Sequence, residues 1–399
     1  MELGQRYLEL MLRFRRRAPT LVESYVGPAE LAARVEAEPV LDEPQLVEQA
    51  AELRAAVERL QVDPDRAAWL AAQLRGVEAA CELLGGGGVG YRTLVQRCYE
   101  VQAVEVDDAQ FEHAHEVITR GLPGPGTPRE RFAAWMATQL VSGEQLVAGL
   151  RALAAEFRAR THALWELPDG ETVEFELARD KPWAGNADYR GGFRTVVQIN
   201  DELPIMGWRM VELVAHEAYP GHHTEQVCKD VNLLRGQNRS ELAVWAYPTS
   251  QALMAEGIAM LAPEMLLGPD IEDVSAQILR PLGIEYDTAG SAAVRRAREL
   301  LLPIRANLAL RLDEGRVDRP GMTAYARRWL LEDDAFVERL VDNLCQRDWP
   351  PYESCYPEGL RLCRRFVAGD HKRFGRLLCE QLTPAAVASC DDPARPRSR

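Results

Sequence analysis

The sequence has little positive charge relative to its acidic content. Its 399 residues include 47 lysines and arginines against 61 aspartates and glutamates, which gives a formal net charge of −14. Only Lys181, Lys229 and Lys372 are lysines, so arginine supplies almost all of the positive charge. Affinity for nucleic acid depends on basic side chains that neutralise phosphates. The composition therefore argues against a nucleic-acid partner.

The eight cysteines form no Cys-x-x-Cys pair. Such pairs are typical of thiolate zinc sites and of redox-active dithiols. Their absence argues against both kinds of site. We expect the thiols to be reduced and to pack as small apolar side chains.

A leader segment and a long apolar run are also missing. The first residues, MELGQR, do not form a basic segment that leads into an apolar run, so the sequence predicts no signal peptide. No uninterrupted apolar stretch approaches the roughly 20 residues that cross a bilayer. We therefore expect a cytoplasmic protein with no membrane partner.

Most of the chain carries apolar residues at the three- and four-residue steps of amphipathic helices. The clearest runs cover residues 6–17, 46–60, 67–84 and 129–164, and the helical period resumes from about residue 206. In 172–177 and 193–200 the apolar residues alternate instead, which is typical of half-buried strands. The segment between them, with Pro182-Trp183 and Gly191-Gly192, is predicted to be a loop. The fold class is therefore mainly α, with one small antiparallel β element in mid-chain.

Residues 216–225, HEAYPGHHTE, hold three of the seven histidines. The usual zinc-hydrolase order is His-Glu-x-x-His, which places both imidazoles within about 40° of each other on a helix. Here His222 comes six residues after His216, about 240° around a regular helix. Pro220-Gly221 predicts a kink or bulge that brings His222 back beside His216. His223 returns to the same face but lies about 10 Å further along the axis, so we favour His222 and keep His223 as the alternative ligand.

A catalytic zinc usually has three protein ligands, and Glu256 is the candidate for the third. It is the only charged residue of the run ALMAEGIAMLA, residues 252–262. A buried carboxylate needs a cation, which a metal held by two histidines supplies, although pairing with a buried arginine is the alternative. Glu217 follows the first ligand at about 100° around the helix. It can therefore serve as the general base that takes a proton from a metal-bound water.

At these residues the chain resembles the bacterial "domain of unknown function 885" family, whose members carry His-Glu-Ala-x-Pro-Gly-His. The downstream Glu256-Gly257 and the late segment Tyr356-Pro357-Glu358-Gly359 also resemble that family. The family is similar to the gluzincin metallopeptidases, so the resemblance implies a multi-helix, neurolysin- or carboxypeptidase-like architecture. It implies a Tyr or His donor to the oxyanion, for which Tyr356 is the first candidate and Tyr352 the second. It also implies that the substrate pairs with an edge strand, for which we expect residues 193–200.

The sequence therefore predicts zinc-dependent hydrolysis of peptide bonds, with His216, His222 and Glu256 as metal ligands and Glu217 and Tyr356 as catalytic residues. Two alternatives remain open: a non-haem iron oxidase or oxygenase at the same site, and a catalytically inactive helical protein that binds peptides. We expect an N-terminal helical region over 1–165, a catalytic helical region with the small sheet over 166–388, and a disordered tail over 389–399. The pattern favours neither endo- nor exopeptidase action and no particular oligomeric state.

Overall fold

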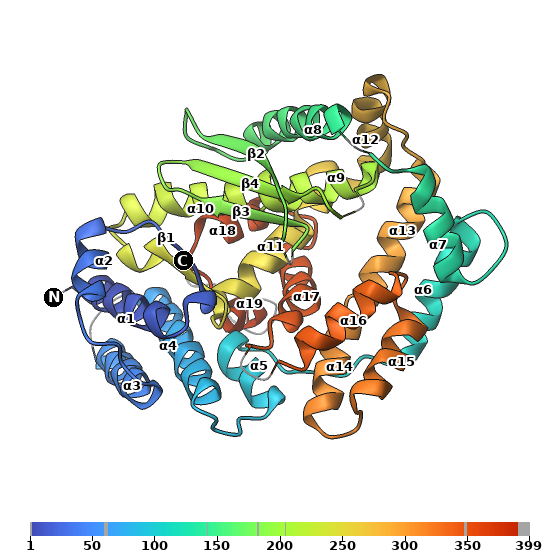
Figure 1. Cartoon of the computed structure of the whole chain (residues 1–399). Coiled ribbons are helices and arrows are strands. Elements are labelled where there is room, and N and C mark those ends of the chain that lie inside the picture. The colour runs from blue at the N-terminus through green and yellow to red at the C-terminus, as the bar shows by residue number, and fades with distance from the viewer. Residues whose placement is uncertain are drawn as a thin grey trace.

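In the computed structural model helices make up most of the chain, which confirms the mainly α prediction (Figure 1). The structure describes residues 2–59, 63–141, 143–181, 183–203, 205–346 and 349–389. The helices before the sheet are α1 (Leu3–Arg17), α2 (Ala29–Glu36), α3 (Glu43–Arg59), α4 (Pro64–Leu84), α5 (Tyr91–Tyr99), α6 (Asp108–Gly121), α7 (Pro128–Thr138) and α8 (Gly143–Leu164). The predicted run 129–164 is thus two helices. Gly143 adopts a φ of +58°, which is incompatible with a continuous right-handed helix.

The second half of the chain is helical again after the sheet. Its helices are α9 (Gly207–Leu213), the π-helix η2 (Val214–Ala218), α10 (His222–Lys229), the π-helix η3 (Asp230–Arg235), α11 (Ser250–Leu267), α12 (Ile271–Leu279), α13 (Thr288–Leu301), α14 (Ile304–Asp313), α15 (Arg319–Trp329), α16 (Asp334–Leu344), α17 (Cys355–Val367), α18 (His371–Cys379) and α19 (Pro384–Ser389). Short 3₁₀ turns join several of them: η1 (Pro19–Leu21), η4 (Ser240–Ala243), η5 (Gly268–Asp270), η6 (Arg280–Leu282) and η7 (Tyr352–Ser354).

The small sheet before α9 has three strands in the order β2-β4-β3, namely β2 (Thr172–Ala178), β4 (Arg194–Asn200) and β3 (Gly185–Tyr189). Only the β3–β4 pair is antiparallel, and the two strands that the sequence predicted, β2 and β4, run parallel. The prediction of a loop over the intervening segment was wrong there, because residues 185–189 form β3. The chain turns back after β3, so β4 pairs antiparallel with β3 along one edge. The other edge of β4 is then the one that pairs with β2. Figure 1 shows this sheet between α8 and the helices α10 and α11.

A second, two-stranded sheet joins distant parts of the chain. Strand β1 (Val22–Tyr25) pairs antiparallel with β5 (Val244–Ala246), which leads into α11. Buried side chains of β5 belong to the same apolar cluster as α1, α3 and α4. The N-terminal helices are therefore packed directly against the segment that begins α11.

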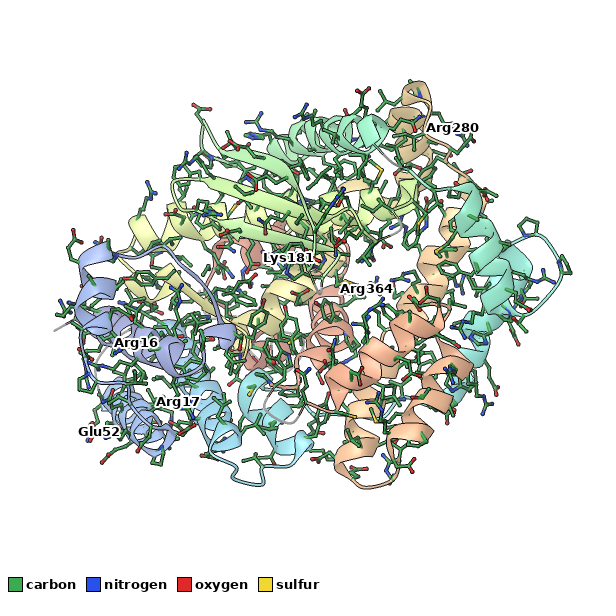
Figure 2. The ribbon with its side chains drawn as sticks, in the orientation of Figure 1. Arg16, Arg17, Glu52, Lys181, Arg280 and Arg364 are labelled. Carbon is green, nitrogen blue, oxygen red and sulfur yellow. The ribbon has the colours of Figure 1, made fainter. Side chains whose placement is uncertain are left out.

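Arginines connect the N-terminal helices to one another. Arg16, near the end of α1, donates hydrogen bonds to the carbonyls of Val35 (2.9 Å) and Glu38 (2.6 Å), where α2 ends. Arg17 pairs with Glu43 at the start of α3. Figure 2 shows both arginines on α1, with Glu52 further out on α3. Cations placed over terminal carbonyls stabilise a helix end, so these arginines hold the first three helices together.

Helices α11 and α17 cross at two glycines. A Cβ at Gly257 would lie 2.4 Å from the carbonyl oxygen of Gly359, and a Cβ at Gly359 would lie 2.5 Å from that of Leu253. Only glycine permits backbones to approach so closely. The Glu-Gly and Pro-Glu-Gly sequences therefore bring α17 and the turn before it close to Glu256.

The segment Ser250–Leu282 is long and apolar enough to cross a membrane by length and composition, which the sequence analysis did not expect. However, 72% of its most apolar window is buried inside the protein, and most side chains of α11 are buried. Many side chains of α11 accordingly belong to the larger apolar core cluster. The predicted division at residue 165 stays a prediction, and residues 390–399 of the predicted disordered tail lie outside the described residues.

Candidate metal centre

The histidine motif occupies a break between two helices. α9 widens into the π-helix Val214–Ala218, the chain turns through Tyr219-Pro220-Gly221, and α10 begins at His222. Proline cannot donate the next helical hydrogen bond, so the helix ends here. A Cβ at Gly221 would lie 1.8 Å from the carbonyl oxygen of His216, which shows how tightly the turn folds back. A π-helical bulge followed by this turn is the distortion that the six-residue spacing required.

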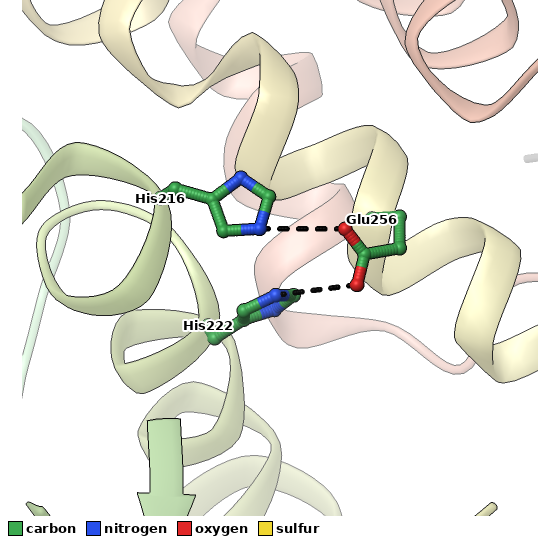
Figure 3. A group of neighbouring side chains, drawn as sticks. All are labelled: His216, His222 and Glu256. Carbon is green, nitrogen blue, oxygen red and sulfur yellow. Dashed lines mark ion pairs between the residues drawn. The ribbon is translucent and has the colours of Figure 1, made fainter. Parts of the chain in front are cut away.

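The turn brings His216 and His222 together opposite Glu256 of α11 (Figure 3). The Nε2 atom of His216 lies 3.3 Å from Oε2 of Glu256, and Nε2 of His222 lies 3.6 Å from Oε1. The three candidate ligand atoms all lie within 4.8 Å of one another. Zinc–ligand bonds are about 2 Å long, so one ion can bridge the three groups after a small side-chain adjustment.

Glu256 has the properties expected of a metal ligand. Apart from the 3.3 Å ion-pair contact with His216, its buried Oε2 atom has no hydrogen-bond partner among the described residues, and such an atom in a native fold requires a cation or donor. Burial alone would raise the pKa of Glu256, but the two imidazoles hold it well below its usual range. Burial would lower the pKa of His222, whereas the pairing with Glu256 raises it to about 9. The donor set of two imidazoles and one charged carboxylate fits a divalent transition metal.

His223, the alternative ligand, is fully buried and points elsewhere. Its Nδ1 lies 2.7 Å from Oγ1 of Thr195, and its Nε2 lies 2.9 Å from Oε2 of Glu171. Burial lowers the pKa of His223, so a neutral ring that accepts from Thr195 and donates to Glu171 satisfies both contacts. Both ring nitrogens are therefore occupied, and His223 cannot bind the same metal as His216.

The proposed base, Glu217, is buried beside the edge strand β3. A Cβ at Gly185, the first residue of β3, would lie 3.3 Å from Oε1 of Glu217 and 2.9 Å from Cδ2 of Leu213. The glycine thus lets the strand pass close to this carboxylate. β3 is an edge of the sheet, whereas β4 is paired on both sides. The expectation that residues 193–200 offer a free edge was therefore wrong, because the unpredicted strand β3 covers that edge.

Two tyrosines, Tyr352 and Tyr356, lie near Glu256. The hydroxyl of Tyr352 donates a hydrogen bond to Oε1 of Glu256, so this tyrosine is bound to a ligand. The ring of Tyr356 lies 5.6 Å from that of Tyr352, centroid to centroid. Burial raises the pKa of Tyr356, and both Glu256 and Glu217 add to the effect. Its hydroxyl has no hydrogen-bond partner among the described residues, which leaves it available to a ligand.

A small pocket opens beside His222, between α10, α11 and the β1–β5 sheet. Its lining includes Val26, Trp245 and Ala255 on the apolar side and Glu225 and Lys229 on the polar side. Lys229 pairs with Glu225, so the lining carries little uncompensated charge there. The pocket has a volume of about 30 Å³, which is space for one or two water molecules beside His222.

Sequence reasoning missed the residue that holds the turn in place. Glu171, just before β2, is buried and accepts hydrogen bonds from Tyr219 Oη at 2.5 Å, His162 Nε2 at 2.8 Å and Arg158 Nε at 2.5 Å, besides that from His223. It thereby joins α8 to both sides of the Pro-Gly turn. A lone glutamate after the turn Pro168-Asp169-Gly170 carries no local signal of this role, because all its partners are distant in sequence or on other elements.

We expect Glu171→Gln to destabilise the fold by about 2 kcal/mol or more at neutral pH, because buried charge-assisted hydrogen bonds are lost. Burial alone would raise the pKa of Glu171, but bonds from His223, Tyr219 and His162 lower it from 4.5 to about 2. A lowered pKa contributes stability above pH 4.5, and that contribution is lost as the pH falls towards 2. In urea unfolding between pH 7 and pH 2.5, the difference in the free energy of unfolding between wild type and variant should shrink as the pH falls below 4.5.

Glu174→Gln is the matched control, because Glu174 is exposed on the neighbouring strand β2. It should unfold like wild type at every pH. A constant difference between wild type and Glu171→Gln across the whole pH range would contradict the role of the charged carboxylate.

Two solved structures share this fold. "The crystal structure of the putative lipoprotein from Colwellia psychrerythraea" matches with a TM-score of 0.56 at 17% identity, over 90% of this chain and 68% of that one. A "putative lipoprotein of unknown function from Shewanella oneidensis" matches with a TM-score of 0.51 at 13% identity, over 87% and 72%. No family model and no curated protein matches the chain. At these identities the likeness concerns the fold alone.

Proposed function

We propose that this chain is a zinc-dependent peptidase of gluzincin-like, neurolysin- or carboxypeptidase-like architecture, similar to the domain of unknown function 885 family. The observation that carries the proposal is the convergence of His216, His222 and the unsatisfied Oε2 atom of Glu256 within 4.8 Å. These three residues would hold the ion. A zinc ion bound there supplies Lewis acidity and lowers the pKa of bound water towards about 7.

The residues around the ligands have the chemistry that hydrolysis needs. Glu217 accepts a proton from the attacking water and passes it to the leaving amine nitrogen. Tyr356 donates a hydrogen bond to the oxyanion that develops on the former carbonyl oxygen. The free edge of β3 pairs with an extended peptide main chain and holds the scissile bond beside Glu217.

The main alternative is iron chemistry at the same site, since two histidines and a carboxylate also bind Fe(II). The buried Glu217 next to a ligand and beside an edge strand favours hydrolysis, because an oxygenase does not require a general base there. An inactive peptide-binding protein would bind peptide at the edge strand β3 without turnover. The cytoplasmic location belongs to the proposal as well, and cell fractionation tests it against the lipoprotein description of the two structural neighbours.

Elemental analysis and a peptide-library assay test the proposal together. We expect about one zinc per chain, cleavage of peptide amides, and loss of cleavage with a chelator that zinc reverses. Iron in place of zinc would favour the oxygenase. Bound peptide without cleavage in the zinc-loaded protein would identify the inactive binder.

A further inference from the structure

Glu23 on β1 has an unusual backbone position. Val22 pairs with Ala246 and Ser24 with Trp245, so β1 advances by two residues while β5 advances by one. Glu23 is the extra residue of this β-bulge. Bulges redirect a side chain out of the normal alternation of a strand and are frequent next to active sites.

Glu23 is connected to the proposed metal centre through two tyrosines. Tyr247 lies within electrostatic reach of Glu23, and the ring of Tyr247 packs edge-on against that of Tyr352 at 5.0 Å. Tyr352 in turn donates to Glu256. Two tyrosines thus connect Glu23 to a proposed metal ligand.

The side chain of Glu23 is exposed to solvent. Partial desolvation by neighbouring protein raises its pKa to about 7, with Glu256 and Glu217 adding to the rise and His222 opposing it. Its strongest charged neighbours are therefore a proposed base and two proposed ligands. Burial raises the pKa of Tyr247 further above 10, so this phenol stays protonated and can act as a hydrogen-bond donor.

The charges around the proposed metal centre do not balance without another cation when all the carboxyl groups are ionised. Glu217 and Glu256 act electrostatically on Glu23, and a divalent ion would neutralise two of these three charges. Glu225 also lies near His222, but Lys229 already pairs with it. Glu23 has no ion pair with any described residue. One additional unit of positive charge, placed at Glu23, would neutralise the remaining carboxylate and stabilise its ionised form.

We propose that Glu23 binds the α-ammonium group of the peptide substrate, so that this chain acts from the N-terminus of peptides. The inference rests on the proposed function, because it takes the scissile bond to lie at the metal centre. A free N-terminus is the cation that every unblocked peptide brings to such a site. Glu23 is then a substrate-binding residue that makes the enzyme an aminopeptidase.

Binding of zinc-directed hydroxamates tests the inference without requiring turnover. Isothermal titration calorimetry of the zinc-loaded full chain would compare leucine hydroxamate with N-acetyl-leucine hydroxamate and N-acetyl-lysine hydroxamate. Both acetyl groups are on the α-nitrogen, so the lysine compound carries its only ammonium group on the side chain. We expect the free amine of leucine hydroxamate to improve the dissociation constant by about 10- to 100-fold over its acetylated form. Glu23→Gln should remove this advantage and leave the affinity for N-acetyl-leucine hydroxamate unchanged. Peptide cleavage should show the same dependence, mainly in KM, with products released from the N-terminus.

The matched control is Glu52→Gln, since Glu52 is exposed on α3, away at the edge of the molecule (Figure 2). It should bind all three compounds like wild type. Equal binding of the free and acetylated leucine compounds by wild type overturns the inference but leaves the peptidase proposal intact. Glu23-dependent binding of the lysine compound alone overturns the N-terminal assignment in favour of a side-chain ammonium. A chain that retains no zinc overturns the peptidase proposal and this inference together.

Discussion

Glu217→Gln should bind zinc like the wild-type chain and lose peptide hydrolysis by about 10²- to 10⁴-fold in kcat, the usual contribution of a general base. The amide keeps the size and hydrogen bonding of the side chain but cannot accept the proton of the attacking water. Glu217 is buried beside Gly185 and is not one of the three converging ligands, so the metal affinity should hardly change. Steady-state kinetics together with zinc content per chain measures both effects.

Glu174→Gln again provides the control, because its exposed side chain on β2 is no part of the metal centre. It should retain full activity. A Glu217→Gln chain that holds its zinc and cleaves peptides at the wild-type rate would exclude Glu217 as the base. A variant that loses zinc as well would instead show that Glu217 contributes to metal binding.

Gly221→Ala should lower zinc affinity by at least about 100-fold, because the backbone shift moves two ligands at once. The added Cβ would meet the carbonyl oxygen of His216 at 1.8 Å and that of Ala215 at 2.5 Å. Both contacts are with backbone atoms, so a rotamer change cannot relieve them and the turn itself must open. His216 and His222 lie on either side of this turn, and their separation depends on it. Competition with a fluorescent zinc chelator measures the affinity, and a thermal melt measures the accompanying loss of stability.

The control for this change is Gly88→Ala, because a Cβ at Gly88 has no neighbour within 4 Å and its φ is not positive. That variant should bind zinc and melt like wild type. If Gly221→Ala kept the wild-type zinc affinity, the tight turn would not be what brings the two histidines together, and the site would have to be reinterpreted.

The two expected results separate the chemistry of the centre from its assembly. Glu217→Gln removes a proton acceptor from an intact site, whereas Gly221→Ala disturbs an intact set of side chains by moving their backbone. Observing metal retention in one and metal loss in the other would therefore assign a function to each half of the motif.

The sequence by itself determined the residues that converge and the local distortion that brings them together. His216, His222 and Glu256 stand out because histidines so close together and a carboxylate in an apolar helix are costly unless they share a ligand. Pro220-Gly221 predicts a break, because proline removes a helical hydrogen-bond donor and glycine permits unusual backbone dihedral angles. The helical periods were also readable, since they depend on neighbours within two turns.

The tertiary structure alone decided which groups surround that centre. Strand β3 belongs to a segment without a clear period, and its pairing with β4 depends on a register set by long-range packing. Glu171 and Glu23 owe their places to contacts with α8, the turn and the bulged β1–β5 pair, which join parts of the chain far apart in sequence. Local sequence encodes propensity and ligand chemistry, whereas the order of strands and the direction of a buried carboxylate depend on which distant surfaces exclude water together.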